Sequence, residues 1–88
     1  MVLLHPIPGK YLERLNESDK GRLKAAIERL GKEPPEGDIR PFSGQKGIFR
    51  LKIGGYRILF RHRDNDILVT HIDPRGQVYT KKNKGNKR

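Results

Sequence analysis

Basic side chains alternate with apolar ones along two adjacent segments, residues 48–53 and 56–61. If Gly54-Gly55 forms a two-residue turn, the segments pair as a β-hairpin that puts Lys52 beside Arg57. The same register pairs only apolar side chains on the other face: Ile53 with Tyr56, Leu51 with Ile58 and Phe49 with Phe60. Like charges side by side lower the stability of a sheet. We therefore expect the basic face to bind an anion the size of a phosphate group.

Phosphodiester chemistry suits these cations and the residues that follow them. Arginine offers bidentate donors and stabilises charge that develops on phosphate oxygens. A lysine among other cations gives up its proton more readily, so Lys52 beside Arg50 and Arg57 is a candidate base. Tyr79 can stack on a nucleobase or hydrogen-bond an attacking hydroxyl. RNA supplies its own nucleophile, the 2′-hydroxyl, so cleavage without a metal is the predicted chemistry. The alternative is a solvated sheet face with Tyr79 capping the core. The full candidate set is Arg50, Lys52, Arg57, Arg61, Arg75 and Tyr79.

Other chemistries lack the residues they need. No pair of carboxylates suits acid–base work, and the three histidines, His5, His62 and His71, lack metal-ligand spacing. The glycine-containing segments do not open a helix, so they are not phosphate loops. We expect neither a metal nor another cofactor.

Charge is distributed unevenly along the 88 residues. Residues 1–38 carry seven basic and seven acidic side chains, whereas residues 39–88 carry thirteen basic and three acidic ones. The net charge of +10 therefore lies in the second half, which is typical of a nucleic-acid-binding surface; a merely solubilising excess is the alternative. The absence of cysteine fits a cytoplasmic protein, and no segment is long and apolar enough to span a membrane.

Two helices are predicted in the first half. Residues 1–7 suit a short edge strand that stops at Pro6 and Pro8, and residues 10–15 suit a short helix. Ser18 is the predicted N-cap of a second helix, which carries an apolar stripe and ends at Gly31. Residues 32–47 are predicted to be a loop.

Strands dominate the second half. After the hairpin, residues 63–66 form a predicted turn and residues 67–72 a third strand. A two-residue loop at Asp64-Asn65 turns His71 toward the core, and a three-residue loop turns it to the basic face. Residues 77–80 are the predicted fourth strand.

The predicted fold class is α+β, with two N-terminal helices on one face of a four-stranded, mainly antiparallel sheet. Residues 1–80 form its single domain, and residues 81–88 form a basic, flexible tail. We expect a thin core and a solvent-exposed sheet face opposite the helices. Lys81 and Lys82 are expected to bind RNA together with Arg50 and Arg61.

The segments from Ile48 to Arg61 and from His71 to Tyr79 resemble the hairpin and the Arg-to-Tyr ending of the RelE/ParE superfamily of bacterial and archaeal toxins. The resemblance covers about residues 4–80, and its features match those of the RelE-like mRNA interferase branch. It implies the same fold and a ribosome-dependent endoribonuclease that cuts mRNA in the decoding site. By similarity, Lys52 takes part in proton transfer, Arg57 and Arg75 stabilise phosphate charge, and Tyr79 orients the nucleotide.

The resemblance also implies partners. A cognate antitoxin is expected to hold the toxin inactive in an oligomeric complex, and the substrate is expected to be mRNA on the ribosome. Two alternatives remain: a ParE-like toxin that poisons gyrase, and a non-catalytic module that binds RNA or the ribosome.

Overall fold

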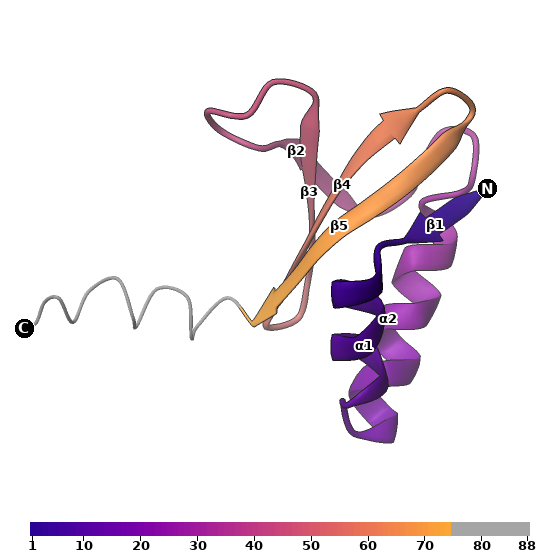
Figure 1. Ribbon diagram of the computed structural model, residues 1–88, viewed down its shortest axis with the longest axis vertical. Coiled ribbons are helices and arrows are strands. Elements are labelled where there is room, and N and C mark those ends of the chain that lie inside the picture. The colour runs from indigo at the N-terminus through magenta and orange to yellow at the C-terminus, as the bar shows by residue number, and fades with distance from the viewer. Residues whose placement is uncertain (75–88) are drawn as a thin grey trace, which may run out of the picture.

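The computed structural model describes residues 1–74. Two helices lie against one face of a twisted sheet, so the molecule has two layers (Figure 1). The elements in chain order are β1 (Val2–Leu4), α1 (Pro6–Glu13), α2 (Glu17–Arg29), β2 (Asp38–Pro41), β3 (Ile48–Ile53), β4 (Tyr56–Arg63) and β5 (Asp66–Pro74). This is the predicted α+β arrangement.

Within residues 1–74 the sheet has five strands in the order β1-β5-β4-β3-β2. β1 pairs with β5 in parallel, and the other neighbours are antiparallel. The predicted count of four strands was too low, because β2 lies inside the segment that we expected to be a loop. Its short run between Gly37 and Pro41 gives little period-2 signal. The strand predicted at residues 77–80 lies outside the described residues.

The predicted hairpin register is confirmed. β3 and β4 pair Ile53 with Tyr56 and Lys52 with Arg57 across the Gly54-Gly55 turn. Gly54 takes a φ of +56°, a backbone conformation that glycine adopts at little cost. The alternation therefore sorts the hairpin as expected, with apolar side chains on the face that the helices cover.

Both helices begin earlier than predicted. α1 starts at Pro6 and not at residue 10, because a proline in the first turn forfeits no intrahelical hydrogen bond. The N-cap of α2 is Asn16, not Ser18: its side chain accepts a hydrogen bond from the Asp19 amide at 2.8 Å. Gly31 follows the C-cap of α2, as predicted.

The core lies between the helices and the inner face of the sheet. α2 contributes Leu23, Ala26, Ile27 and Leu30, and the strands contribute Leu51, Ile58, Phe60, Ile67, Val69 and Ile72. Phe49 stacks on Phe60 across the hairpin, with 5.7 Å between ring centroids. This packing fixes which face of the sheet stays open.

A β-bulge in β5 determines the orientation of His71. The β4–β5 turn is the two-residue loop at Asp64-Asn65, since Arg63 pairs with Asp66. That loop was expected to turn His71 toward the core, and this expectation was wrong. Between Leu59 and Phe60 the register shifts by one residue, so that His71 lies opposite Leu59 on the open face. Ile72 takes the core position in its place, 6% exposed.

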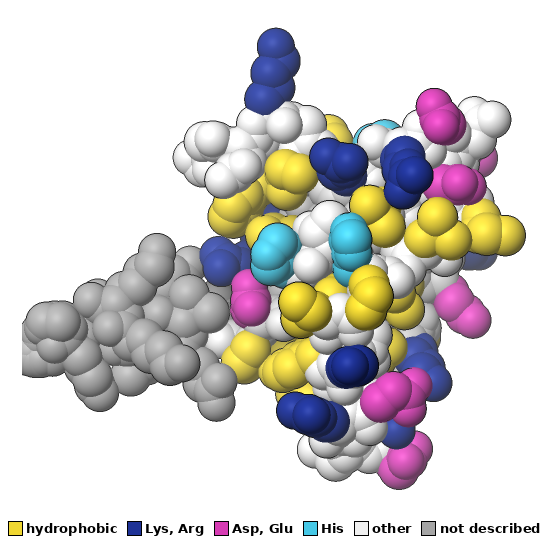
Figure 2. Space-filling model, in the orientation of Figure 1, with side chains coloured by type: hydrophobic (Ala, Val, Ile, Leu, Met, Phe, Trp, Pro, Cys, Tyr) yellow, Lys and Arg dark blue, Asp and Glu magenta, His cyan; other side chains and the backbone are white. Residues whose placement is uncertain are grey.

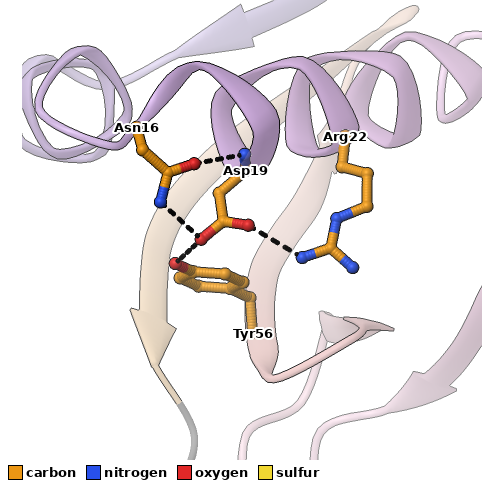
Figure 3. A network of polar contacts seen from close by, with 4 residues as sticks. All are labelled: Asn16, Asp19, Arg22 and Tyr56. Carbon is orange, nitrogen blue, oxygen red and sulfur yellow. Dashed lines mark hydrogen bonds and ion pairs between the residues drawn. The ribbon is translucent and has the colours of Figure 1, made fainter.

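A polar network joins the tip of the hairpin to the start of α2 (Figure 3). The Tyr56 hydroxyl donates to the Asp19 carboxylate at 2.9 Å, and Arg22 donates to the same carboxylate at 3.0 Å. These two bonds, the first above all, hold the pKa of Asp19 below its usual value. The same contact raises the pKa of Tyr56. The network thereby fixes the turn that sets the position of Lys52 and Arg57.

This network predicts a pH-dependent contribution to stability. Since the folded-state pKa of Asp19 is lowered, its contribution is present above the unfolded-state pKa and is lost as pH falls through the folded-state pKa. We expect Asp19→Asn to lower the free energy of unfolding at pH 7, and the difference from wild type to shrink as the pH falls below the unfolded-state pKa of about 3.9. Urea denaturation at several pH values measures this. Glu17→Gln, in the same helical turn but 94% exposed, is the control and should change little. Equal wild-type and Asp19→Asn stabilities at pH 7 would contradict the role of the network.

Candidate anion-binding site

Four charged residues form one row across the open face of the sheet. Asp38 on β2 pairs with Lys52 on β3, Lys52 pairs with Arg57 on β4, and Arg57 pairs with Asp73 on β5. Paired residues point to the same face, so all four lie opposite the helices. The two cations are central and the two carboxylates are at the ends. We call this set the charged row.

The end carboxylates change the expectation drawn from the like-charged pair. We predicted that an external anion compensates the repulsion between Lys52 and Arg57, but the chain supplies Asp38 and Asp73 itself. Arg57 Nη2 lies 3.9 Å from Asp73 Oδ2, a long contact between groups with 16% and 34% side-chain exposure. Lys52 was expected to act as a base because its neighbours are cations, but Asp38 on β2 also pairs with it. Any phosphate must compete with these two carboxylates.

Arg50 lies one step along the sheet from the charged row. It pairs with Arg40 on β2 and Leu59 on β4, and its Nη1 atom lies 3.9 Å from Asp38 Oδ2. Its side chain is 19% exposed, so this part of the open face is less accessible to solvent than predicted. Leu59, which is 8% exposed, adds apolar cover to the same face. Arg50 therefore adds positive charge in a partly apolar setting.

Phe42 positions Arg57 from the loop after β2. The Arg57 guanidinium carbon lies 5.4 Å from the centroid of the Phe42 ring, within the range of a cation–π contact. Sequence reasoning did not single out Phe42, because an isolated aromatic in a predicted loop shows no periodicity. Together with Asp73, Phe42 holds Arg57 against the sheet.

Among residues 1–74, two buried guanidinium nitrogens in this region find no hydrogen-bond partner: Arg50 Nη1 and Arg57 Nε. A buried donor without an acceptor is unfavourable, and a bond to a charged oxygen is among the strongest remedies. Because both atoms are covered, a ligand can reach them only if the guanidinium groups turn outward. The ion pairs that oppose this movement are long, at 3.9 Å each. The two arginines are thus able to exchange a carboxylate for a phosphate.

The structure brings part of the predicted site together. Lys52 and Arg57 are cross-strand neighbours, Arg50 lies beside them, and Arg61 is exposed further along β4 on the same face. The four other predicted site residues, Arg75, Tyr79, Lys81 and Lys82, lie outside the described residues. Within residues 1–74 no three His, Asp or Glu side chains are grouped to hold a metal ion. No helix in that range is long and apolar enough to cross a membrane.

The fold is that of RelE toxins. The RelB–RelE antitoxin–toxin complex from Methanococcus jannaschii matches with a TM-score of 0.72 and 21% identity, over 90% of this chain and 96% of that one. The isolated E. coli RelE toxin matches with a TM-score of 0.71 and 18% identity, over 97% and 96%. The RelE–RelB complex from Pyrococcus horikoshii OT3 matches with a TM-score of 0.70 and 24% identity, over 86% and 94%. At these identities the likeness establishes the fold alone.

A family model assigns the chain more specifically. The model described as "ParE toxin of type II toxin-antitoxin system, parDE" matches residues 8–79. The chain therefore belongs to this family of type II toxins. No curated protein sequence matches the chain significantly. The predicted membership of the RelE/ParE superfamily is confirmed by the family model and the fold together.

The charge balance of the row yields a prediction for anion binding. Asp73→Asn releases Arg57 from its carboxylate, so we expect tighter binding of a single-stranded RNA oligonucleotide, by up to about fivefold for an ion pair of about 1 kcal/mol. Fluorescence anisotropy at fixed salt measures the affinity. Asp64→Asn in the β4–β5 turn is the matched control, because it changes the net charge equally but lies outside the charged row. Equal effects of the two substitutions would show that only net charge matters.

Proposed function

We propose that this toxin is an endoribonuclease that cleaves mRNA in the ribosomal decoding site without a metal. The observation that carries the proposal is the grouping of Lys52, Arg57 and Arg50 on the open face, with buried guanidinium nitrogens that find no acceptor in the described part of the chain. Such a group suits a phosphodiester, whose oxygens gain negative charge during cleavage. The likeness of the fold to RelE toxins supports the same reading, whereas the family model, which is described as ParE, does not separate it from the second candidate below.

The proposed reaction uses the substrate's own nucleophile. The 2′-hydroxyl oxygen attacks the adjacent phosphorus, a 2′-O–P bond forms, and the bond from phosphorus to the 5′-oxygen breaks. The 2′-hydroxyl loses a proton and the leaving 5′-oxygen gains one. Lys52 takes part in this proton transfer, and Arg57 stabilises the phosphate oxygens. Arg75 and Tyr79, which lie outside the described residues, are proposed on the sequence resemblance to stabilise charge and orient the nucleotide.

Dependence on the ribosome follows from the shape of this site. Lys52 is exposed on a sheet face, where little protein surrounds a flexible RNA strand. Reacting groups accelerate a reaction strongly only when they are held in near-attack geometry. The ribosome would supply this positioning by holding the mRNA, with Arg50, Arg61, Lys81 and Lys82 as further RNA contacts.

A cognate antitoxin is the proposed regulatory partner. A type II toxin belongs to a toxin–antitoxin system. The similar proteins from M. jannaschii and P. horikoshii were solved as complexes of RelE with RelB. A partner that covers the charged row would need acidic side chains to match Lys52, Arg57 and Arg61. The toxin and antitoxin would assemble as an oligomer in the cytoplasm, where the ribosomes are.

Gyrase poisoning is the second candidate function, because the matching family model is described as ParE. The gyrase-directed branch does not use the cationic and tyrosine set proposed here. Supercoiling assays with purified gyrase separate the two candidates, since only a gyrase poison should stall the enzyme.

The test of the leading proposal is cleavage of mRNA on programmed ribosomes in the presence of EDTA, mapped by primer extension. We expect wild type to cut in phase with codons, and Arg57→Ala to reduce the cleavage rate by about 100- to 1,000-fold, the usual cost of losing one group that stabilises transition-state charge. Lys24→Ala, an exposed lysine on α2, is the matched control and should retain full activity.

Three outcomes would contradict this proposal. Full activity of a Lys52→Ala, Tyr79→Phe double variant would reject the site assignment. Stalled gyrase with intact mRNA would favour the second candidate. Salt-sensitive RNA or ribosome binding with no cleaved product at any concentration would indicate a non-catalytic binding module.

A further inference from the structure

A hollow of about 400 Å³ opens between the start of α1 and the β4–β5 pair. It is lined by Arg61 from β4, by Leu68, Thr70 and His71 from β5, and by His5 and Ile7 from the β1–α1 segment. Figure 2 shows histidine side chains near the middle of the view, with hydrophobic side chains beside them and charged side chains close by. The charged row does not include any of these residues, so the hollow is a separate feature of the open face.

The lining combines apolar walls with convergent polar groups. Ile7 is 81% exposed although it is a large apolar side chain, and Leu68 forms part of the opposite wall. Arg61 and the two imidazoles are the charged or ionisable groups among the described residues of the lining, and none of these residues carries a carboxylate. A hollow of this size and composition, within the usual range of about 300–1,000 Å³ for ligand sites, suits a flat ring that carries an anion. A nucleotide has this chemistry.

The β-bulge also orients the His71 ring. Thr70 Oγ1 donates to the Leu59 carbonyl at 3.4 Å, and His71 Nδ1 lies 3.1 Å from Thr70 Oγ1. Because the Thr70 hydrogen is directed to Leu59, its oxygen is free to accept from Nδ1–H. In the neutral ring, Nε2 then carries the lone pair and can accept a hydrogen bond from a base. RNA-binding proteins read unstacked bases by such contacts, with stacking on His or Arg planes.

The hollow lies beside the proposed cleavage site along one strand direction. Arg61 is four residues from Arg57 on β4, about 13 Å at the usual rise of a strand, and both residues face the open side. His71 is two residues from Asp73 on β5. An extended RNA strand bound at the charged row therefore reaches the hollow with a neighbouring nucleotide.

We propose that this hollow binds a nucleotide next to the cleaved linkage: its base lies between Ile7 and Leu68, His71 Nε2 accepts a base N–H, and Arg61 contacts its phosphate. The proposal rests on the proposed function for the identity of the strand, but mononucleotide binding tests it independently. The hollow would thus contribute to the choice of cleavage position, a role that the charged row, which contacts only the backbone, does not provide.

The test is titration of the full chain with the four nucleoside 5′-monophosphates, followed by amide and imidazole NMR shifts. We expect shifts at Ile7, Thr70 and His71, with affinity about tenfold weaker in an Ile7→Ser, His71→Ala double variant, in keeping with the loss of one base contact. Ile7 and His71 are exposed, so these substitutions should leave the fold intact. His62→Ala is the matched control, because His62 is exposed but packs near Phe49 and Phe60 away from the hollow.

Several results would overturn the inference. Shifts produced equally by inorganic phosphate would indicate an anion site only, and no shift in the hollow would exclude a nucleotide there. If the double variant weakens antitoxin binding but not nucleotide binding, the hollow is a protein-binding site instead.

On programmed ribosomes, the double variant should alter the position of cleavage and raise KM. If wild type binds mononucleotides in the hollow but cuts no mRNA, the proposed function fails and the nucleotide site stands.

Discussion

The alternation of the β3–β4 hairpin is the constraint on which the rest of the structure depends. One face carries Leu51, Ile58 and Phe60, which are at most 2% exposed, and the helices must cover it because apolar side chains of this size are unstable in water. Because successive side chains of a strand point to opposite faces, the cations must then lie on the other face of the sheet. The site is thus a consequence of how the core is buried. Lys52 and Arg57 are placed by the same register that packs Phe49 on Phe60, and the pairing of β2 with β3 and of β4 with β5 adds Asp38 and Asp73.

The charged row shows how the fold tolerates two adjacent cations before any ligand is bound. Asp38 and Asp73 come from strands on either side of the hairpin, and each faces one cation. Their contacts with Arg50 and Arg57 are long, and two guanidinium nitrogens have no acceptor within the 74 residues that the structure describes. This arrangement offsets repulsion without saturating the donors. A site of this kind stays folded when empty and still favours an anion that offers better geometry than the carboxylates do.

The sequence predicted those parts of the fold that depend on neighbouring residues. It did not predict those that depend on contacts with residues far away along the chain. The hairpin register follows from alternation and a Gly-Gly turn, so it was predicted residue by residue. β2 was missed because its four residues gain their strand conformation by pairing with β3. Asn16 and Ser18 are both good N-caps, and the choice between them depends on the Asp19 contact with Tyr56, 37 residues away. Likewise Lys52, Arg57 and Arg50 were found as a group, whereas Asp38, Asp73 and Phe42 join them only through the sheet.

The β5 bulge links the packing of the core to the layout of the open face, because one inserted residue affects both. Without it, the two-residue turn at Asp64-Asn65 would direct His71 inward and leave Ile72 in water. Burying an imidazole without a partner is unfavourable and burying an isoleucine is favourable, so the bulge stabilises the core independently of its effect on the open face. It also places His71 beside the apolar wall of the hollow and gives its ring a fixed partner in Thr70. A shift in register that the sequence does not reveal thereby extends the functional face beyond the charged row.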